Sequence, residues 1–266
     1  MTEEIRGEGQ ALPEQQPGEY PEDLERRFSE PILRGNEGVE KAQIWISAFL
    51  VVIAAVIAYS NTFALPFRAE DRELILGNAG IQRFVEFDRA LEVSPHQPVE
   101  MLGLGLNEWL LPSAPGSFRA VSIALHALGA VLVFLLCRRL FRGTVSESVA
   151  MLAGLLFALH PLATESVNFL SVRGGLMAAV FSLGSVVLML RATDEDNRLR
   201  IGAYAGSLLC FVLAWGSMPG VVGLPVLVLA ADRIVRNGRM TIARFAAHAG
   251  YWAMLLLLLV AHMAAF

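Results

Sequence analysis

The stretch HPLATESVNFLSVR, residues His160 to Arg173, decides how this chain is interpreted. It holds a histidine, a glutamate, an asparagine and an arginine, yet it lies between the apolar runs Val149–Leu159 and Leu176–Leu190. Pro161 has no backbone donor and favours the end of a helix just before it, while Thr164 can cap a short new helix. The pattern predicts a polar turn at a membrane surface, between two helices that enter the membrane.

The composition of the chain is that of an integral membrane protein. Hydrophobic residues make up 55% of its 266 residues, charged residues make up 17%, and the mean hydropathy is +0.53. This balance is more apolar than that of soluble domains, so membrane lipids are expected partners. No basic patch invites nucleic acid. Cys137 and Cys210 fall in separate apolar runs, and the chain lacks the spacing of a zinc site, so neither a disulfide nor a metal site is predicted.

The predicted fold is an all-α integral membrane protein with about seven transmembrane helices. Only the first, second and last apolar runs reach the roughly 20 residues that a perpendicular helix needs to cross a bilayer. The four shorter runs require protein neighbours. The seven runs are Ala42–Leu65, Ala120–Leu140, Val149–Leu159, Leu176–Leu190, Ile201–Trp215, Val221–Ala231 and Phe245–Phe266.

The distribution of basic residues predicts the orientation, because Lys and Arg near span ends are retained in the cytoplasm. With a cytoplasmic N-terminus and alternating spans, 15 of the 21 basic residues lie inside. The other six lie outside: Arg68, Arg72, Arg83, Arg89, Arg119 and Arg173. Both the long loop 66–119 and the second loop 160–175 are therefore expected on the outer face.

Two segments outside the spans have distinct characters. Residues 1–41 carry eleven acids, five bases and four prolines, which predicts a flexible, acidic cytoplasmic arm before the membrane domain 42–266. The outer loop 66–119 instead mixes charged residues with Leu, Ile, Phe and Trp at helical spacing. It is expected to form a small folded cap of interfacial helices.

The polar residues of the second outer loop allow two interpretations. In one, His160, Glu165, Asn168 and Arg173 satisfy one another at the bilayer edge and have only a structural role. In the other, Arg173 holds an anionic phosphate, and Glu165 or His160 orients a reacting group, with Asn168 in support.

A second candidate lies directly after the first span, where Glu70 and Asp71 are adjacent. One carboxylate there could accept a proton from a hydroxyl group or hold a divalent ion, although a solvated charge run is the simpler interpretation. His126 lies inside an apolar span and is interpreted as a buried histidine bonded to a neighbouring helix.

Several quoted stretches resemble the membrane half of the GT-C glycosyltransferases, and most closely the transmembrane-and-tetratricopeptide O-mannosyltransferases and their bacterial homologues. They are AYSNTFALPFRAEDRELILGN, HQPVEMLGLGLNEWLL, FRAVSIALHALGAVLVFLL and LLFALHPLATESVNFLSVRGGLMAAVF. The resemblance implies a GT-C-like helical fold in a bacterial cytoplasmic membrane. It also implies sugar transfer from a polyprenyl-phosphate donor to a protein hydroxyl, with Asp71 and Glu70 near the acceptor and Arg173 near the phosphate.

The departures from the family pattern decide between two functions. The expected Asp-Asp is Glu70-Asp71, the Arg-Pro is Gln97-Pro98, an expected Asp is Gly175, and an expected Lys-Glu pair is Ser217-Met218. Each lost charge at a desolvated phosphate site should cost about 2–4 kcal/mol of transition-state stabilisation.

The favoured expectation is therefore a non-catalytic structural or accessory subunit of a larger membrane complex, with other membrane-protein subunits as partners and no cofactor. The alternative is an active glycosyltransferase that takes a polyprenyl-phosphate sugar as its donor. A channel or transporter is disfavoured, because no span carries a series of ionisable residues.

Overall fold

The computed structural model describes residues 22–83, 86–111, 113–142, 146–194, 199–236 and 241–265. Every regular element in these ranges is helical, which confirms the all-α prediction. The chain divides into two compact units, residues 1–43 and 44–266. Helix α1, Glu22–Tyr59, begins inside the segment that was predicted to be an arm. Residues 1–21 of that predicted arm lie outside the described part of the chain.

Four stretches of the described chain are long and apolar enough to cross a membrane: Gly38–Ala64, Pro115–Leu140, Leu170–Ala192 and Arg244–Ala264. They correspond to α1, α6 (Pro115–Leu140), α9 (Arg173–Ala192) and α12 (Ile242–Ala265). The run Leu176–Leu190 was expected to be too short. Its helix reaches spanning length because it begins at the charged residue Arg173, whose side chain is completely buried in the protein.

The prediction of about seven spans is not supported by helix length. The other three apolar runs form the helices α7 (Glu147–Ala158), α10 (Ile201–Ser217) and α11 (Leu224–Val235). Helix α7 has 12 residues, so it is about 18 Å long, whereas the hydrocarbon core is about 30 Å thick. These helices pack against longer ones, with α7 on α6 and both α10 and α11 on α9.

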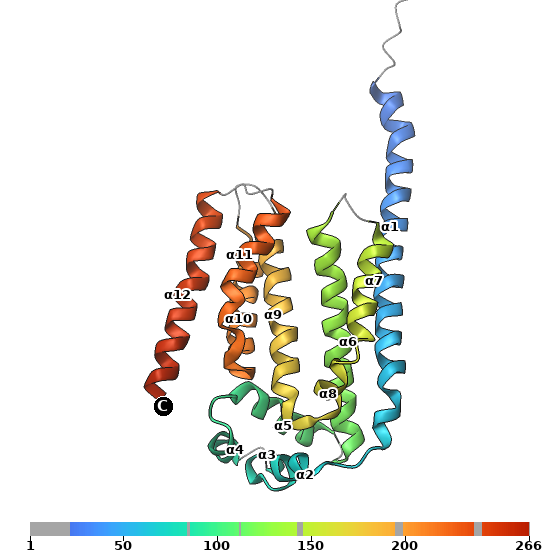
Figure 1. Ribbon diagram of the computed structural model, residues 1–266. Coiled ribbons are helices and arrows are strands. Elements are labelled where there is room, and N and C mark those ends of the chain that lie inside the picture. Colours follow the sequence, from blue (N-terminus) through green and yellow to red (C-terminus); the bar gives the residue numbers. More distant parts are fainter. Residues whose placement is uncertain are drawn as a thin grey trace, which may run out of the picture. The chain divides into compact units, whose positions relative to one another are not determined.

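The loop after α1 folds into short helices at one end of the bundle, which confirms the predicted cap (Figure 1). We call this the loop end. Its own apolar core joins residues of the loop to Phe118 of α6 and to Leu170: Ile75, Ile81, Ala90, Met101, Leu104, Phe118 and Leu170. The elements are η1 (Ser60–Ala64), α2 (Ala69–Asp71), a π-helical turn η2 (Arg72–Leu76), α3 (Ala79–Gln82), α4 (Phe87–Val93) and α5 (Pro98–Leu110).

The stretch His160–Arg173 forms the polar turn that its sequence predicts. After α7 ends at Ala158, the chain makes the short helix α8 (Ala163–Asn168) and the turn η4 (Leu170–Val172) before α9. Thr164 does not cap α8, because the residue before the helix is Leu162 and no side chain caps it. Instead, the Leu162 amide donates to Nδ1 of His160 at 3.2 Å.

Before α11 the chain forms η5 (Pro219–Gly223), directly after Met218 at the loop end. The opposite end of the bundle is where α6, α9 and α11 end and where α7, α10 and α12 begin. We call this the arginine end, after Arg139 and Arg236, which bridge neighbouring helices there. An apolar core fills the space between α9, α10, α11 and α12, with Phe211 and Tyr251 completely buried in it.

Candidate functional site: a buried centre of arginines and carboxylates

Arg173 forms the centre of the candidate site and is completely buried. Its Nε donates to the hydroxyl of Ser122 at 3.2 Å, and its Nη1 donates to Oδ1 of Asn107 at 3.1 Å. Its Nη2 donates to the carbonyl oxygen of Phe118 at 2.6 Å. The guanidinium therefore joins α9 to α5 and α6, and each of its nitrogens has an acceptor within the protein.

Asp71 is also completely buried, and both of its carboxylate oxygens accept backbone hydrogen bonds. Oδ1 accepts from the amides of Leu170 and Ser171 at 3.0 and 3.1 Å, and Oδ2 accepts from the amide of Arg68 at 3.3 Å. These bonds tie α2 to the η4 turn that leads into α9. Charge-assisted bonds of this kind are stronger than bonds between neutral groups.

Glu100 contributes a second buried carboxylate, 2% exposed, in the first turn of α5. Its Oε1 accepts from the Gly174 amide at 2.7 Å. Burial raises the pKa of Glu100 to about 7, while the Gly174 amide and the charge of Arg173 act in the opposite direction. Position 174 requires glycine, because a Cβ there would lie 2.5 Å from Oε2 of Glu100 and 2.6 Å from the Ser217 carbonyl oxygen.

Arg119, 1% exposed, is the fourth charged member of this centre. Its Nη1 donates to the Leu65 carbonyl, and its Nη2 donates to the Pro66 carbonyl at 2.8 Å. It thereby ties the first turn of α6 to the residues that follow η1. Two buried arginines and two buried carboxylates thus give this centre balanced formal charges.

Glu100, Asn107 and Arg119 were not among the predicted site residues. The sequence did carry a signal for Glu100 and Asn107. They are seven residues apart and therefore lie on the same helix face as Met101 and Leu104. Polar side chains on the apolar face of an amphipathic helix are expected to have buried partners. For Arg119, the signal is a charge in the first turn of a long apolar helix.

The other predicted site residues do not join the centre. Glu70 and Glu165 are exposed, and so is His160 at the end of α7. Asn168 is half-buried, and its buried Oδ1 has no hydrogen-bond partner among the described residues. The structure therefore brings Asp71 and Arg173 into one buried network and separates them from the remaining predicted polar residues.

A cavity of about 320 Å³ lies beside the polar turn. His160 and Ser166 are its polar lining residues from the turn, and Gly175 of α9 lines another side. His126 lines its inner part and donates from Nε2 to the carbonyl oxygen of Ala158 at 3.0 Å, which confirms the interpretation of this histidine as helix-bonded. In the described residues, no three His, Cys, Asp or Glu side chains gather as metal ligands would.

Three positions at which the sequence departs from the O-mannosyltransferase pattern, Gly175, Ser217 and Met218, gather at the start of α9. The Ser217 carbonyl approaches Gly174, and the Met218 sulfur would lie 3.8 Å from a Cβ at Gly175. Ser217 is completely buried and donates its hydroxyl to the Leu213 carbonyl at 2.8 Å. Small and apolar groups thus occupy the side of the centre at which the resemblance places charges.

Comparisons with known proteins support the resemblance over part of the chain. The chain is 31% identical to mouse Protein O-mannosyl-transferase TMTC3 over 104 residues, which are 39% of this chain and 11% of the relative. The human protein of the same name is 30% identical over the same length. Drosophila melanogaster Protein O-mannosyl-transferase Tmtc2 is 30% identical over 181 residues, 59% of this chain and 19% of the relative.

The chain thus spans between about a tenth and a fifth of the length of the curated relatives that it matches. No family profile matches it, and no solved structure matches it significantly. Together with its apolar helices, these similarities identify a helical, membrane-type protein with partial likeness to O-mannosyl-transferases.

Proposed function

We propose that this chain is a non-catalytic structural or accessory subunit of a larger membrane complex, built on a GT-C-like helical framework. The observation that supports this most directly is the state of Arg173, which is completely buried and donates from three nitrogens to protein acceptors. A phosphate-binding arginine has to present donors to its ligand. Three of the five N–H donors of Arg173 are already engaged, and the side chain has no exposed surface, so a ligand could reach it only if Ser122, Asn107 or Phe118 moved away.

The state of Asp71 supports the same proposal. A general base needs a carboxylate oxygen within hydrogen-bond reach of the proton that it removes. Both oxygens of Asp71 instead accept backbone amides, and the side chain has no exposed surface. Asp71 and Arg173 are therefore proposed to act as braces that hold the loop end onto the helices.

The proposal places all seven apolar helices within the bilayer, with the loop end outside and the N-terminus in the bacterial cytoplasm. Helices α1 and α12 would contact lipids or other subunits, because only 22% of the most apolar window of each is buried within this chain. Ser94→Cys, in the cap, tests the orientation, because the added thiol should react with an impermeant thiol reagent added to intact cells.

The subunit proposal is tested by extraction into mild detergent and measurement of mass by ultracentrifugation. The expected result is a stable assembly in which other chains accompany this one in fixed stoichiometry. A homogeneous particle with the protein mass of a single 28.9 kDa chain would contradict the proposal.

A second candidate function is sugar transfer from a polyprenyl-phosphate donor to a protein hydroxyl. Two observations favour it: the relatives are named O-mannosyl-transferases, and the 320 Å³ cavity is lined by the exposed His160 and the half-buried Ser166 beside the turn that Asp71 holds. Asp71 would act as the base, with Glu70 beside it, and Arg173 would bind the donor phosphate after a rearrangement of the buried centre.

The two functions are separated by a transfer assay with polyprenyl-phosphate mannose and a serine-containing peptide, using wild type, Asp71→Asn and Glu92→Gln. Glu92 is exposed on α4 and serves as the matched control. If the chain is an enzyme, wild type and the control transfer mannose, and the folded Asp71→Asn protein does not. If the chain is an accessory subunit, none of the three transfers mannose, while the wild type still assembles with its partners.

A further inference from the structure

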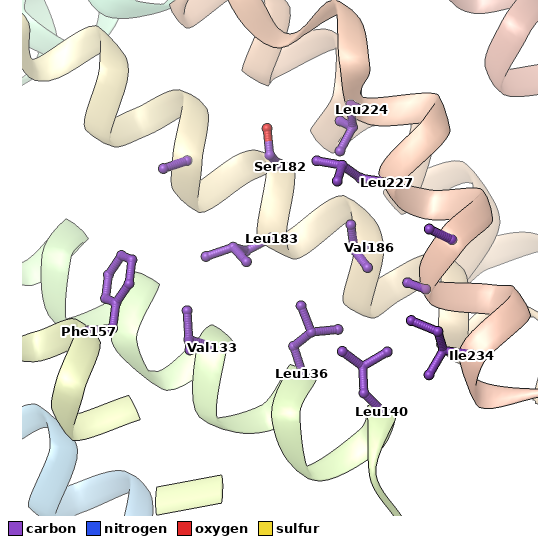
Figure 2. Close-up of a pocket in the computed structure, with 13 residues that line it drawn as sticks. Val133, Leu136, Leu140, Phe157, Ser182, Leu183, Val186, Leu224, Leu227 and Ile234 are labelled. Atoms are coloured by element: carbon purple, nitrogen blue, oxygen red, sulfur yellow. The ribbon is translucent and has the colours of Figure 1, made fainter. Parts of the chain in front are cut away.

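A second cavity, of about 510 Å³, lies between α6, α9 and α11, away from the buried centre. Figure 2 shows its side chains pointing into the space from all three helices, with Phe157 of α7 near one end and Leu140 and Ile234 near the other. Its lining is apolar except for Ser182. Cavities of about 300–1,000 Å³ are typical of small-molecule sites, and this one suits an aliphatic chain.

The end of this groove near Leu140 and Ile234 is the arginine end of the bundle. Arg139 precedes Leu140, and its Nη2 donates to Oδ2 of Asp194 at 2.5 Å and to the Leu190 carbonyl at 3.1 Å. Arg236, two residues after Ile234, donates to the Thr193 carbonyl, and its Nη1 donates to the Asp194 carbonyl at 3.2 Å. These groups join the same three helices whose apolar side chains line the groove.

The donors at this end favour an anion. Arg139 and Arg236 both pair with Asp194, since Nη2 of Arg236 lies 3.6 Å from Oδ1, and Nε of Arg236 also lies 3.8 Å from Oδ1 of the buried Asp232. Arg139 uses one nitrogen for both of its bonds, and its Nε and Nη1 have no partner among the described residues. The side chains of Arg139 and Asp194 are 23% and 37% exposed, so a ligand can reach them.

We propose that this groove binds an anionic phospholipid, with an acyl chain between α6, α9 and α11 and the phosphate on Arg139. The phosphate would accept from Nε and Nη1 of Arg139, the two nitrogens that make no bond among the described residues. Basic pockets between membrane helices, with apolar walls below them, recognise anionic head groups in this way. This inference does not depend on whether the chain is an accessory subunit or an enzyme.

The test is native mass spectrometry of the full chain, reconstituted with phosphatidylglycerol and phosphatidylcholine that carry identical acyl chains. Wild type should retain phosphatidylglycerol in preference to phosphatidylcholine. Arg139→Gln should reduce this preference about fivefold, because one arginine at a membrane surface contributes about 1 kcal/mol to binding of an anionic lipid. Arg139→Lys keeps the charge and should retain most of the preference.

Two further variants separate the head-group site from the apolar groove. Ala230→Phe places a large side chain in the groove and should lower retention of both lipids. Arg83→Gln is the matched control, because Arg83 is a salt-bridged arginine at the loop end with a side chain that is 73% exposed. It should change the retention of neither lipid.

Equal retention of the two lipids by wild type would overturn the proposal, and so would an unchanged preference in Arg139→Gln. Displacement of the lipid by millimolar inorganic phosphate would also overturn it, since the groove would then contribute nothing.

Discussion

The two ends of the helical bundle use the same residue types with opposite consequences. At the loop end, Arg119, Arg173, Asp71 and Glu100 are each at most 2% exposed and belong to four different elements. At the arginine end, the Arg139–Asp194 pair is partly exposed, although Asp232 behind it is completely buried. A buried charge must have its partners inside the protein, whereas an exposed one can share them with water or a ligand. Burial therefore makes the first cluster a brace and leaves the second able to bind.

The largest effect that distinguishes the two ends is expected from Arg173→Gln. The substitution removes a buried cation and leaves the carboxylates of Glu100 and Asp71 without the charge that faces them. The acceptors at Ser122, Asn107 and Phe118 lose a donor at the same time, and each unsatisfied buried polar group costs about 1–3 kcal/mol. The protein should therefore unfold at a much lower temperature in detergent, or fail to fold. The exposed Arg83→Gln variant should melt like wild type, and equal melting of both variants would contradict the role of Arg173 as a brace.

The next largest effect concerns pH and Glu100. The pKa of Glu100 is raised from 4.5 to about 7 in the folded protein, chiefly by burial. Its contribution to stability is therefore fully present below about pH 4.5 and is lost as the pH rises through 7, a change on the order of 3 kcal/mol. The groups that face it are Arg173 and the Gly174 amide.

Glu100→Gln should accordingly gain stability relative to wild type between pH 5 and pH 8, as measured by thermal unfolding across that range. Glu92→Gln, on the exposed face of α4, should run parallel to wild type at every pH. A constant difference between Glu100→Gln and wild type would show that Glu100 does not take up a proton on folding in this range.

A smaller effect is expected where α9 meets the buried centre. Gly174→Ala would place a Cβ 2.5 Å from Oε2 of Glu100 and 2.6 Å from the Ser217 carbonyl. Overpacking of this kind costs about 1–3 kcal/mol. Gly175→Ala is a matched control on the next residue, because its Cβ would meet only the Met218 sulfur at an ordinary 3.8 Å. Unfolding in detergent should show a larger loss of stability for Gly174→Ala than for Gly175→Ala. An equal loss of stability in both would mean that the helix backbone, and not the Cβ contacts of residue 174, causes it.

The smallest effect is expected at the arginine end. Asp194→Asn weakens two ion pairs, but its side chain is 37% exposed and Arg139 is partly hydrated. Partly exposed pairs contribute about 0–1 kcal/mol, so the melting temperature should change little. A loss comparable to that of Arg173→Gln would remove the contrast between the two ends.

The fold was predictable from sequence to the extent that it depends on local pattern. The apolar runs predicted helices at seven places, and the mixed spacing of residues 66–119 predicted a helical cap. The number of spans was not predictable in this way, because the apolar side chains of a helix such as α7 or α10 can pack either against neighbouring helices or against lipid. The N-terminus of α8 was also mispredicted, because the helix begins at Ala163, one residue before Thr164, and no side chain caps it.

The candidate site was half predictable. Asp71 and Arg173 stood out as charges next to apolar runs, and the structure places both in one buried network. Their role as a site stays a prediction. Glu100 and Arg119 were missed because their partners, Gly174 and the Leu65 carbonyl, are more than fifty residues away in the chain. Only packing brings such groups together.

By itself, the sequence determined the class of this protein, because an apolar composition and long hydrophobic runs leave helices in a membrane as the favoured arrangement of the backbone. It also carried the partial likeness to O-mannosyl-transferases. The tertiary structure alone decided what the charges do. Whether an arginine is a brace or a ligand-binding group depends on how many of its donors the surrounding helices have already engaged, and that number is set by burial and distance, which no local pattern records.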